Sequence, residues 1–182
     1  MGDVPLSAEG IEQARMTAAY FAGKSVDRVY SSPLRRARET ADIIGLRLGL
    51  PVVVDDRLRE RANWGDLPGQ TFEEFVEMWD RCTRDREYEP LIGDSAKQAG
   101  ERLESFALDL GRDGRSGSVV AVGHGGLITD FLINVIAAEE LERWHPRFAE
   151  VQGQLVAECS ITRMDWAGDR YGLTRFADVS HL

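Results

Sequence analysis

The sequence has few cysteines and no long apolar run, and both absences limit what the protein can be. Cys82 and Cys159 stand alone, without a Cys-x-x-Cys pair, which gives no zinc framework and no obvious redox pair. We expect both to be reduced thiols. No stretch reaches the ~18 consecutive apolar residues of a membrane-spanning helix, and the first ten residues lack a basic stretch followed by an apolar one. We therefore expect no signal peptide, no membrane partner and a cytoplasmic location.

Positive charge is also scarce. The chain has 22 Lys and Arg against 31 Asp and Glu, a formal net charge of −9 over 182 residues. An acidic surface argues against non-specific binding to nucleic acid or anionic lipid. With 43% hydrophobic and 29% charged residues, the composition is that of a globular protein long enough to bury a substantial core. We expect a single domain over residues 1–182.

Helical and strand patterns alternate along the chain. We expect helices over residues 7–23, 32–49, 71–81, 95–111, 127–136 and 139–144, and strands over 28–31, 52–55, 118–122, 160–166 and 171–176. Strands separated by helices predict right-handed crossovers and a mostly parallel α/β sheet. The last two strands predict an antiparallel hairpin, turned at residues 167–169. Ligands of such sheets bind at the carboxyl ends of the strands.

The sharpest local pattern is a strand followed by Gly123-His124-Gly125-Gly126 and an apolar helix. Glycines let the backbone turn tightly and approach a ligand, and the N–H groups of a helix N-terminus form an anion site. A histidine there could donate to a bound phosphate. Alternatively, His124 is simply a polar residue at a strand end and the glycines only form the turn.

A second junction places Arg35, Arg36 and Arg38 at the start of a helix, where the helix dipole disfavours cations. This suggests a compensating anion. Arg36 and Thr40 share a helix face, and a guanidinium fork suits bidentate phosphate contact. The alternative is a solvated basic face, which is the favoured interpretation for Arg35 and Arg38 individually.

A third candidate is Glu60, in an irregular loop over residues 58–69. A carboxyl group above a sheet can act as a general acid if its pKa is raised. Taken alone, Glu60 between Arg59 and Arg61 is better explained as a surface ion-pair partner. In the helix that follows, the apolar face predicts core packing, or one aromatic ring lining a substrate pocket; its residues are Phe72, Phe75, Val76 and Trp79.

Taken together and in this order, these stretches resemble the histidine phosphatase superfamily, the phosphoglycerate-mutase-like proteins. The resemblance covers almost the whole chain. It implies a three-layer α/β/α fold, with the C-terminal hairpin at the sheet edge and a short cap over residues 58–95. The matching segments are Pro5-Leu6-Ser7-x-x-Gly10-x-x-Gln13-Ala14, Ser32-x-Leu34-x-Arg36-Ala37-x-x-Thr40-Ala41, Leu58-x-Glu60-x-x-x-Gly65-x-x-x-Gly69, Gly93-Asp94-Ser95, Gly123-His124-Gly125-Gly126 and residues 176–182.

The resemblance also implies roles. Arg36 would hold the phosphoryl oxygens, His124 would bind the phosphoryl group and stabilise its charge, and Glu60 would protonate the leaving oxygen. The N–H of Gly125 would add an oxyanion contact. The phosphoryl group of a small metabolite would pass to a histidine and then to water, with no metal or cofactor. Trp64, beside Glu60, is the best candidate for an aromatic substrate contact.

The sequence departs from the family at the nucleophile. Family members begin with a strand that ends in Arg-His-Gly, and this sequence has no such motif. Its other histidines, His145 and His181, do not match the context of the nucleophile. We therefore expect the first strand to be missing, either because the chain starts late, which we favour, or because the protein is a pseudo-phosphatase with half a phosphate pocket.

These considerations predict a phosphomonoesterase that is inactive or impaired as this chain. The alternatives are a non-catalytic binder of a phosphorylated ligand and a mutase-type phosphotransferase. The short segment between Glu60 and Ser95 favours a phosphatase over a mutase, because the resemblance gives mutases longer insertions there. An unpaired sheet edge beside the strand leading to His124 predicts marginal stability or self-association, as in a homodimer.

Overall fold

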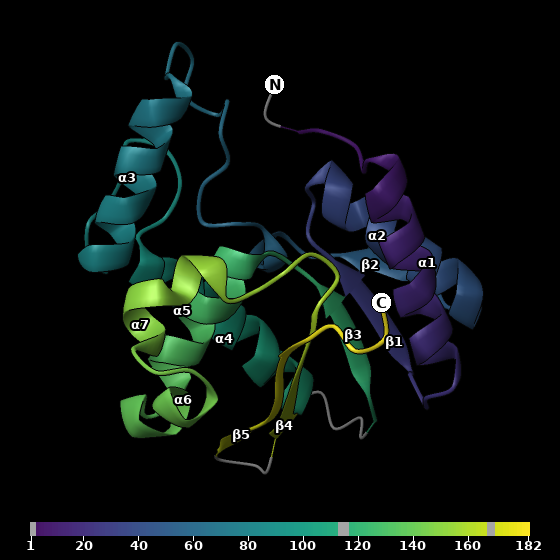
Figure 1. Ribbon diagram of the computed structural model, residues 1–182. Coiled ribbons are helices and arrows are strands. Elements are labelled where there is room, and N and C mark those ends of the chain that lie inside the picture. The colour runs from purple at the N-terminus through teal and green to yellow at the C-terminus, as the bar shows by residue number, and fades with distance from the viewer. Residues whose placement is uncertain (1–2, 113–116, 167–169) are drawn as a thin grey trace.

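A computed structural model describes residues 3–112, 117–166 and 170–182 (Figure 1). At its centre, three strands form a parallel sheet with β1 in the middle. The strands are β1 (Arg28–Ser31), β2 (Val52–Val54) and β3 (Val119–Val122). In register, Val29 lies opposite Val52 on β2 and Val120 on β3. Because all three strands are parallel, their carboxyl ends meet at one edge of the sheet.

Two pairs of helices enclose this sheet. Helices α1 (Ala8–Ala22) and α2 (Arg35–Leu48) lie on one side, and α4 (Ala96–Arg112) and α5 (Gly125–Val135) on the other (Figure 1). A core cluster of Ala18, Val29, Ala41, Ile44 and Val120 joins α1 and α2 to the sheet. On the opposite face, the rings of Tyr30 and Phe106 meet edge-to-face at 5.1 Å. The predicted α/β fold with helices on both sheet faces is confirmed.

The C-terminal part forms a second core against α5. It contains α6 (Ala138–Trp144), α7 (Phe148–Val151) and the antiparallel hairpin of β4 (Ile161–Trp166) and β5 (Tyr171–Asp178). Its buried residues are Phe131, Leu132, Ile136, Leu141, Phe148 and Leu173. Within the described residues the hairpin pairs only with itself, so it is a separate sheet, and β3 ends the three-stranded one. The predicted turn at 167–169 lies outside the described residues.

Local sequence signals explain several helix ends. The side chain of Ser7 accepts a hydrogen bond from the N–H of Gly10, as expected of a helix N-cap. Gly49 ends α2 in the left-handed conformation with φ 69°, which glycine adopts without a steric penalty. The predicted helix limits at residues 7 and 49 are confirmed. No helix in the described part of the chain is long and apolar enough to cross a membrane.

Two helix starts differ from the prediction. Ser32 does not cap α2; the N-cap is Leu34 and the helix begins at Arg35. The hydroxyl of Ser32 is instead bonded to the ring of His124 and accepts from the N–H of Leu34. Helix α5 begins at Gly125, two residues earlier than predicted, so Gly125 and Gly126 belong to its first turn.

Helix α3 (Phe72–Arg84) starts as predicted, at a capping box between Thr71 and Glu74. The expectation that its apolar face packs in the core is wrong. Phe72 is 54% exposed and Val76 39% exposed. The helix stands apart from the main body (Figure 1), and its firmest packing is at its C-terminal half, around Cys82, its only buried residue.

Candidate functional site

His124 sits where β1 and β3 end side by side. The N–H of Ser32, just after β1, donates to the carbonyl of Val122, the last residue of β3, at 2.9 Å. This bond brings the Ser32 hydroxyl within 2.7 Å of His124 Nε2. The ring is 8% exposed and lies at the N-cap of α5, where its side chain makes no capping bond. The imidazole is therefore fixed in place and presented at the carboxyl edge of the sheet.

The electrostatic setting of His124 favours its neutral form. Burial, together with the charges of Arg36 and Arg102, lowers the pKa of His124 to about 3. At neutral pH the ring is uncharged, in a field of positive sign. A bound anion would oppose that field and raise the pKa of the ring. The site thus has positive potential that an anionic ligand would neutralise.

Arg36 differs from the two arginines beside it. Its Nη1 donates to Asn63 Oδ1 at 3.1 Å, and it has no ion pair with a carboxylate of the described residues. Arg35 and Arg38 are paired with carboxylates on their own helix, Glu39 and Asp42. Arg36 is therefore the member of the cluster whose charge is left for a ligand.

Glu60 does not form the surface ion pair that its neighbours suggest. Arg59 pairs with Asp94, and Arg61 pairs with Asp130. The carboxyl of Glu60 accepts from two backbone groups, the N–H of Arg61 at 2.9 Å and that of Gly126 at 3.0 Å. Desolvation raises the pKa of Glu60, although these backbone hydrogen bonds and the charge of Arg61 oppose the rise. A carboxyl group with a raised pKa is suited to donate a proton.

Gly125 and Trp64 are linked to the site less directly than His124, Arg36 and Glu60. Gly125 directly follows His124, and a Cβ there would lie 3.4 Å from Val156; the hydrogen bond to Glu60 comes from the next residue. Trp64 is 36% exposed and meets Phe72 edge-to-face at 5.3 Å. It therefore packs against the outer face of α3.

A cavity of about 140 Å³ lies under α3, and Trp64 is not among its lining residues. Asn63, which accepts the hydrogen bond from Arg36, does line it. The apolar and aromatic residues of its wall are Ala62, Leu67, Phe75, Met78, Tyr88, Pro90, Leu91 and Ile92. The aromatic surface of this cavity thus comes from Phe75 and Tyr88.

Sequence reasoning missed Ser32 as the partner of His124, and it missed Arg102. Arg102 on α4 donates Nη1 to the carbonyls of Arg57 and Arg59 and pairs with Asp94 through Nη2 at 2.8 Å. These contacts hold the chain that leads into Glu60. Arg102 lies in an ordinary amphipathic helix, so no local pattern marks it. The only signal in the sequence that pointed to it was the segment Gly93-Asp94-Ser95, quoted above for the resemblance, which contains its partner Asp94.

The other two histidines bond elsewhere. His145 is exposed, and its Nδ1 lies 2.8 Å from the carbonyl of Pro146. His181 Nε2 lies 3.0 Å from Thr17 Oγ1, and its ring packs on Tyr20. Neither has a hydrogen bond to the site. Over the described ranges, no three His, Cys, Asp or Glu side chains are grouped so as to hold a metal ion.

Comparison with known proteins agrees with this geometry. A family model described as histidine phosphatase superfamily, branch 1, matches residues 1–179. The chain is 27% identical to an uncharacterised phosphatase, PhoE, of Bacillus subtilis, over 99% of this chain and 85% of the relative. It is 30% identical to phosphoglycerate mutase-like protein 4 of Arabidopsis thaliana, over 99% and 77%.

Comparison with a solved structure agrees with the family match. A mycobacterial glucosyl-3-phosphoglycerate phosphatase superposes with a TM-score of 0.76 at 26% identity, over 97% of this chain and 89% of that one. The fold and the family match thus cover the same, nearly complete, length of chain. The protein belongs to branch 1 of the histidine phosphatase superfamily.

Proposed function

We propose that the site binds the phosphoryl group of a small phosphate monoester and that the protein is a phosphomonoesterase working through a phosphohistidine. The observation that carries the proposal is the buried, neutral His124 beside Arg36, a cation without a carboxylate partner in the described residues. The names of two relatives, a phosphatase of Bacillus subtilis and a mycobacterial sugar-phosphoglycerate phosphatase, support it. Action in the cytoplasm is part of the same proposal.

Each group would have one task. The guanidinium fork of Arg36 would hold two phosphoryl oxygens. His124, drawing a proton as the anion binds, and the N–H of Gly125 would donate to the charge that develops on the phosphoryl group. Glu60 would give its proton to the leaving oxygen as the P–O bond breaks and the N–P bond of the phosphohistidine forms. Water would then cleave the phosphohistidine and release inorganic phosphate.

The proposed mechanism needs a histidine nucleophile, and the sequence has three histidines. His145 and His181 are bonded away from the site, and His124 has the role of the phosphoryl-binding partner. We therefore propose that the 182-residue chain binds phosphate but turns over slowly or not at all. Binding without turnover is also what a regulatory pseudo-phosphatase would show, and this is the second candidate.

The test pairs turnover with binding. We would measure hydrolysis of p-nitrophenyl phosphate and binding of inorganic phosphate or vanadate by the parent chain, His124→Ala and Arg36→Ala. Arg38→Ala is the matched control, because it removes a neighbouring arginine that is already paired with Asp42. Trp64→Ala and a Phe75→Ala variant would report which aromatic side chain contacts the substrate.

The outcomes separate the candidates. Binding without turnover, lost in both site variants and kept in the control, supports an incomplete pocket. Turnover abolished by His124→Ala would mean a working phosphatase whose nucleophile we have misassigned. Exchange of phosphate between positions of a phosphoglycerate would indicate a mutase. It would contradict the preference for a phosphatase that follows from the short cap over residues 58–95. Equal phosphate binding by the parent, His124→Ala, Arg36→Ala and Arg38→Ala would exclude the proposed function.

The outer edge of β3 carries a related proposal. In the described part of the chain this edge pairs with no strand, and Ala121 is exposed there. An unpaired edge favours pairing with another chain, so we propose self-association of two copies through β3. Light scattering should show a concentration-dependent dimer that Ala121→Lys weakens. A monomer at every concentration would contradict it.

A further inference from the structure

Trp79 of α3 meets Glu60 at the first turn of α5. A Cβ placed on Gly126 would lie 2.7 Å from Cη2 and Cζ2 of Trp79 and 2.9 Å from Oε1 of Glu60. The indole edge and the carboxyl group therefore converge on the same small space, beside the N–H that donates to Glu60 Oε2. Only glycine leaves room for both. Trp79 thus comes from the cap but packs beside a residue of the site.

Arg61 holds the indole from its face. The guanidinium carbon of Arg61 lies 3.8 Å from the centroid of the Trp79 ring, a cation–π distance. Its Nη2 donates to the carbonyl of Trp79 at 3.1 Å and to Thr83 Oγ1 at 2.7 Å. One side chain therefore fixes both the backbone and the ring of Trp79.

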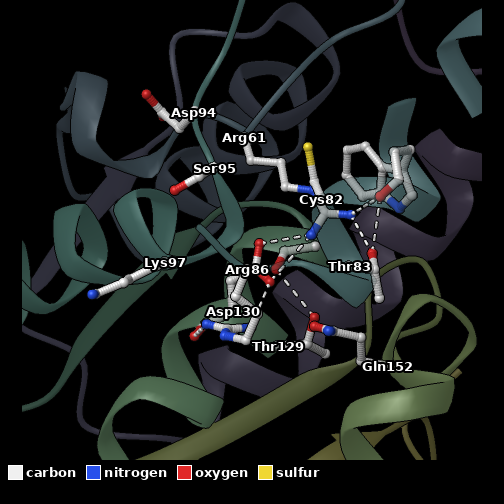
Figure 2. Close-up of polar contacts among 12 residues, drawn as sticks. Arg61, Cys82, Thr83, Arg86, Asp94, Ser95, Lys97, Thr129, Asp130 and Gln152 are labelled. Atoms are coloured by element: carbon white, nitrogen blue, oxygen red, sulfur yellow. Dashed lines mark hydrogen bonds and ion pairs between the residues drawn. The ribbon is translucent and has the colours of Figure 1, made fainter. Parts of the chain in front are cut away.

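Arg61 is itself fixed by α5. Its Nη1 donates to both carboxylate oxygens of Asp130, at 3.2 and 3.1 Å (Figure 2). Both side chains are almost fully buried. Arg86 joins from the far side, with Nη1 3.3 Å from Asp130 Oδ1. We call the buried pair of Arg61 and Asp130 the clamp; it ties α3 to α5, the helix that follows His124.

We propose that Trp79 is a positioning residue for Glu60: held by the clamp, its indole excludes water from the carboxyl group and keeps it oriented as a proton donor. The proposal rests on the function proposed above only in giving Glu60 the role of acid. A carboxyl group shielded from water keeps its proton to higher pH, which matches the direction of the pKa of Glu60. The cap would thereby tune the acid as well as cover the substrate.

Several charges also act on Glu60. Arg61 favours its ionised form, and Arg102 on α4 and Asp130 on α5 interact with it electrostatically. Changing any of these would alter charge and hydration together. Trp79 is neutral, so replacing it changes water access without adding or removing a charge. It is therefore the position at which shielding can be tested by itself.

The experiment is a 13C NMR titration of the Glu60 carboxyl in the full chain, labelled at glutamate side-chain carboxyls and assigned with Glu60→Gln. We expect Trp79→Ala to lower the pKa of Glu60 by about 1, because water reaches the group. Trp79→Phe lacks the ring atoms Cη2 and Cζ2 but can still pack on Arg61, so a smaller shift in the same direction is expected. Trp144→Ala, on α6, is the control and should leave the titration unchanged.

The unchanged pKa of Glu60 in a folded Trp79→Ala protein would overturn the proposal. If that variant fails to fold, an unchanged pKa in Trp79→Phe would do the same. The titration needs no turnover, so the two proposals fail separately. If the pKa of Glu60 shifts but the parent does not bind phosphate, the positioning role stands and the phosphatase proposal fails. If phosphate binding depends on His124 but the pKa of Glu60 does not change in the variants, the phosphatase proposal stands and the positioning role fails.

Discussion

Glu60 and Arg61 are neighbours in the chain, yet their side chains enter two clusters that balance charge differently. In the clamp, Asp130 lies between the guanidinium groups of Arg61 and Arg86. Around His124, Arg36 forms no ion pair with a carboxylate of the described residues. Structural charges are stable in a protein interior when partnered there, whereas perturbed and unpartnered charges mark sites that await a ligand. The two side chains that lead into these different clusters, Glu60 and Arg61, belong to adjacent residues.

Breaking the clamp should have the largest effect on stability. Asp130→Ala leaves two arginines, Arg61 and Arg86, near each other without their shared carboxylate, and should cost about 3–5 kcal/mol of unfolding free energy. Urea denaturation measures it. Asp42→Ala, which removes the exposed partner of Arg38, is the control and should cost less than ~1 kcal/mol. Equal losses in the two variants would remove the distinction between the clusters.

The next effect is a pH dependence that belongs to His124. Its pKa is about 3 in the folded protein, against about 6.5 when unfolded. The unfolded state therefore binds the extra proton as pH falls below 6.5, and stability is lost in that direction. Between pH 7 and pH 5 the loss is about 2 kcal/mol.

The check is a comparison of urea midpoints at these two pH values. His124→Gln should lose stability less steeply than the parent, because its side chain does not titrate. Carboxylates titrate in both proteins, so only the difference between the two slopes is attributable to His124. Parallel slopes would show that the ring is not held neutral.

The smallest effect on stability is expected at Arg36. This prediction distinguishes the cluster around His124 most clearly from the clamp. Arg36→Ala should change the unfolding free energy by no more than about 0.5 kcal/mol, as for a side chain with few internal partners. Its phosphate affinity should fall at least about tenfold, since a charge-assisted hydrogen bond contributes about 1.5–3 kcal/mol. Calorimetric titration with inorganic phosphate, beside urea denaturation, measures both. A strong loss of stability would place Arg36 with the clamp.

The sequence predicted the features that depend on neighbouring residues. The helix limits at Ser7, Gly49 and Thr71 are set by local caps, and the sequence pattern placed these limits correctly. His124 at the start of α5 was located in the same way.

Features that depend on distant pairs were missed or misjudged. A helix was predicted to start at Ser32 because the residue that bonds its hydroxyl, His124, lies 92 positions away. Glu60 looked like an ion-pair partner because Asp130, the partner of Arg61, is 69 positions away. The apolar face of α3 was assigned to the core because periodicity reports a face but not what covers it.

The way α3 is attached has a consequence for its motions. Its C-terminal half is fixed through Trp79, Cys82 and Thr83, whereas Phe72 and Val76 near its start are largely exposed. Opening should therefore begin at the N-terminal turns and stop at the clamp. Backbone amides of the first two turns would exchange with solvent deuterium well before those after Trp79, so the cap helix would loosen toward its free end while the end beside Glu60 stays closed.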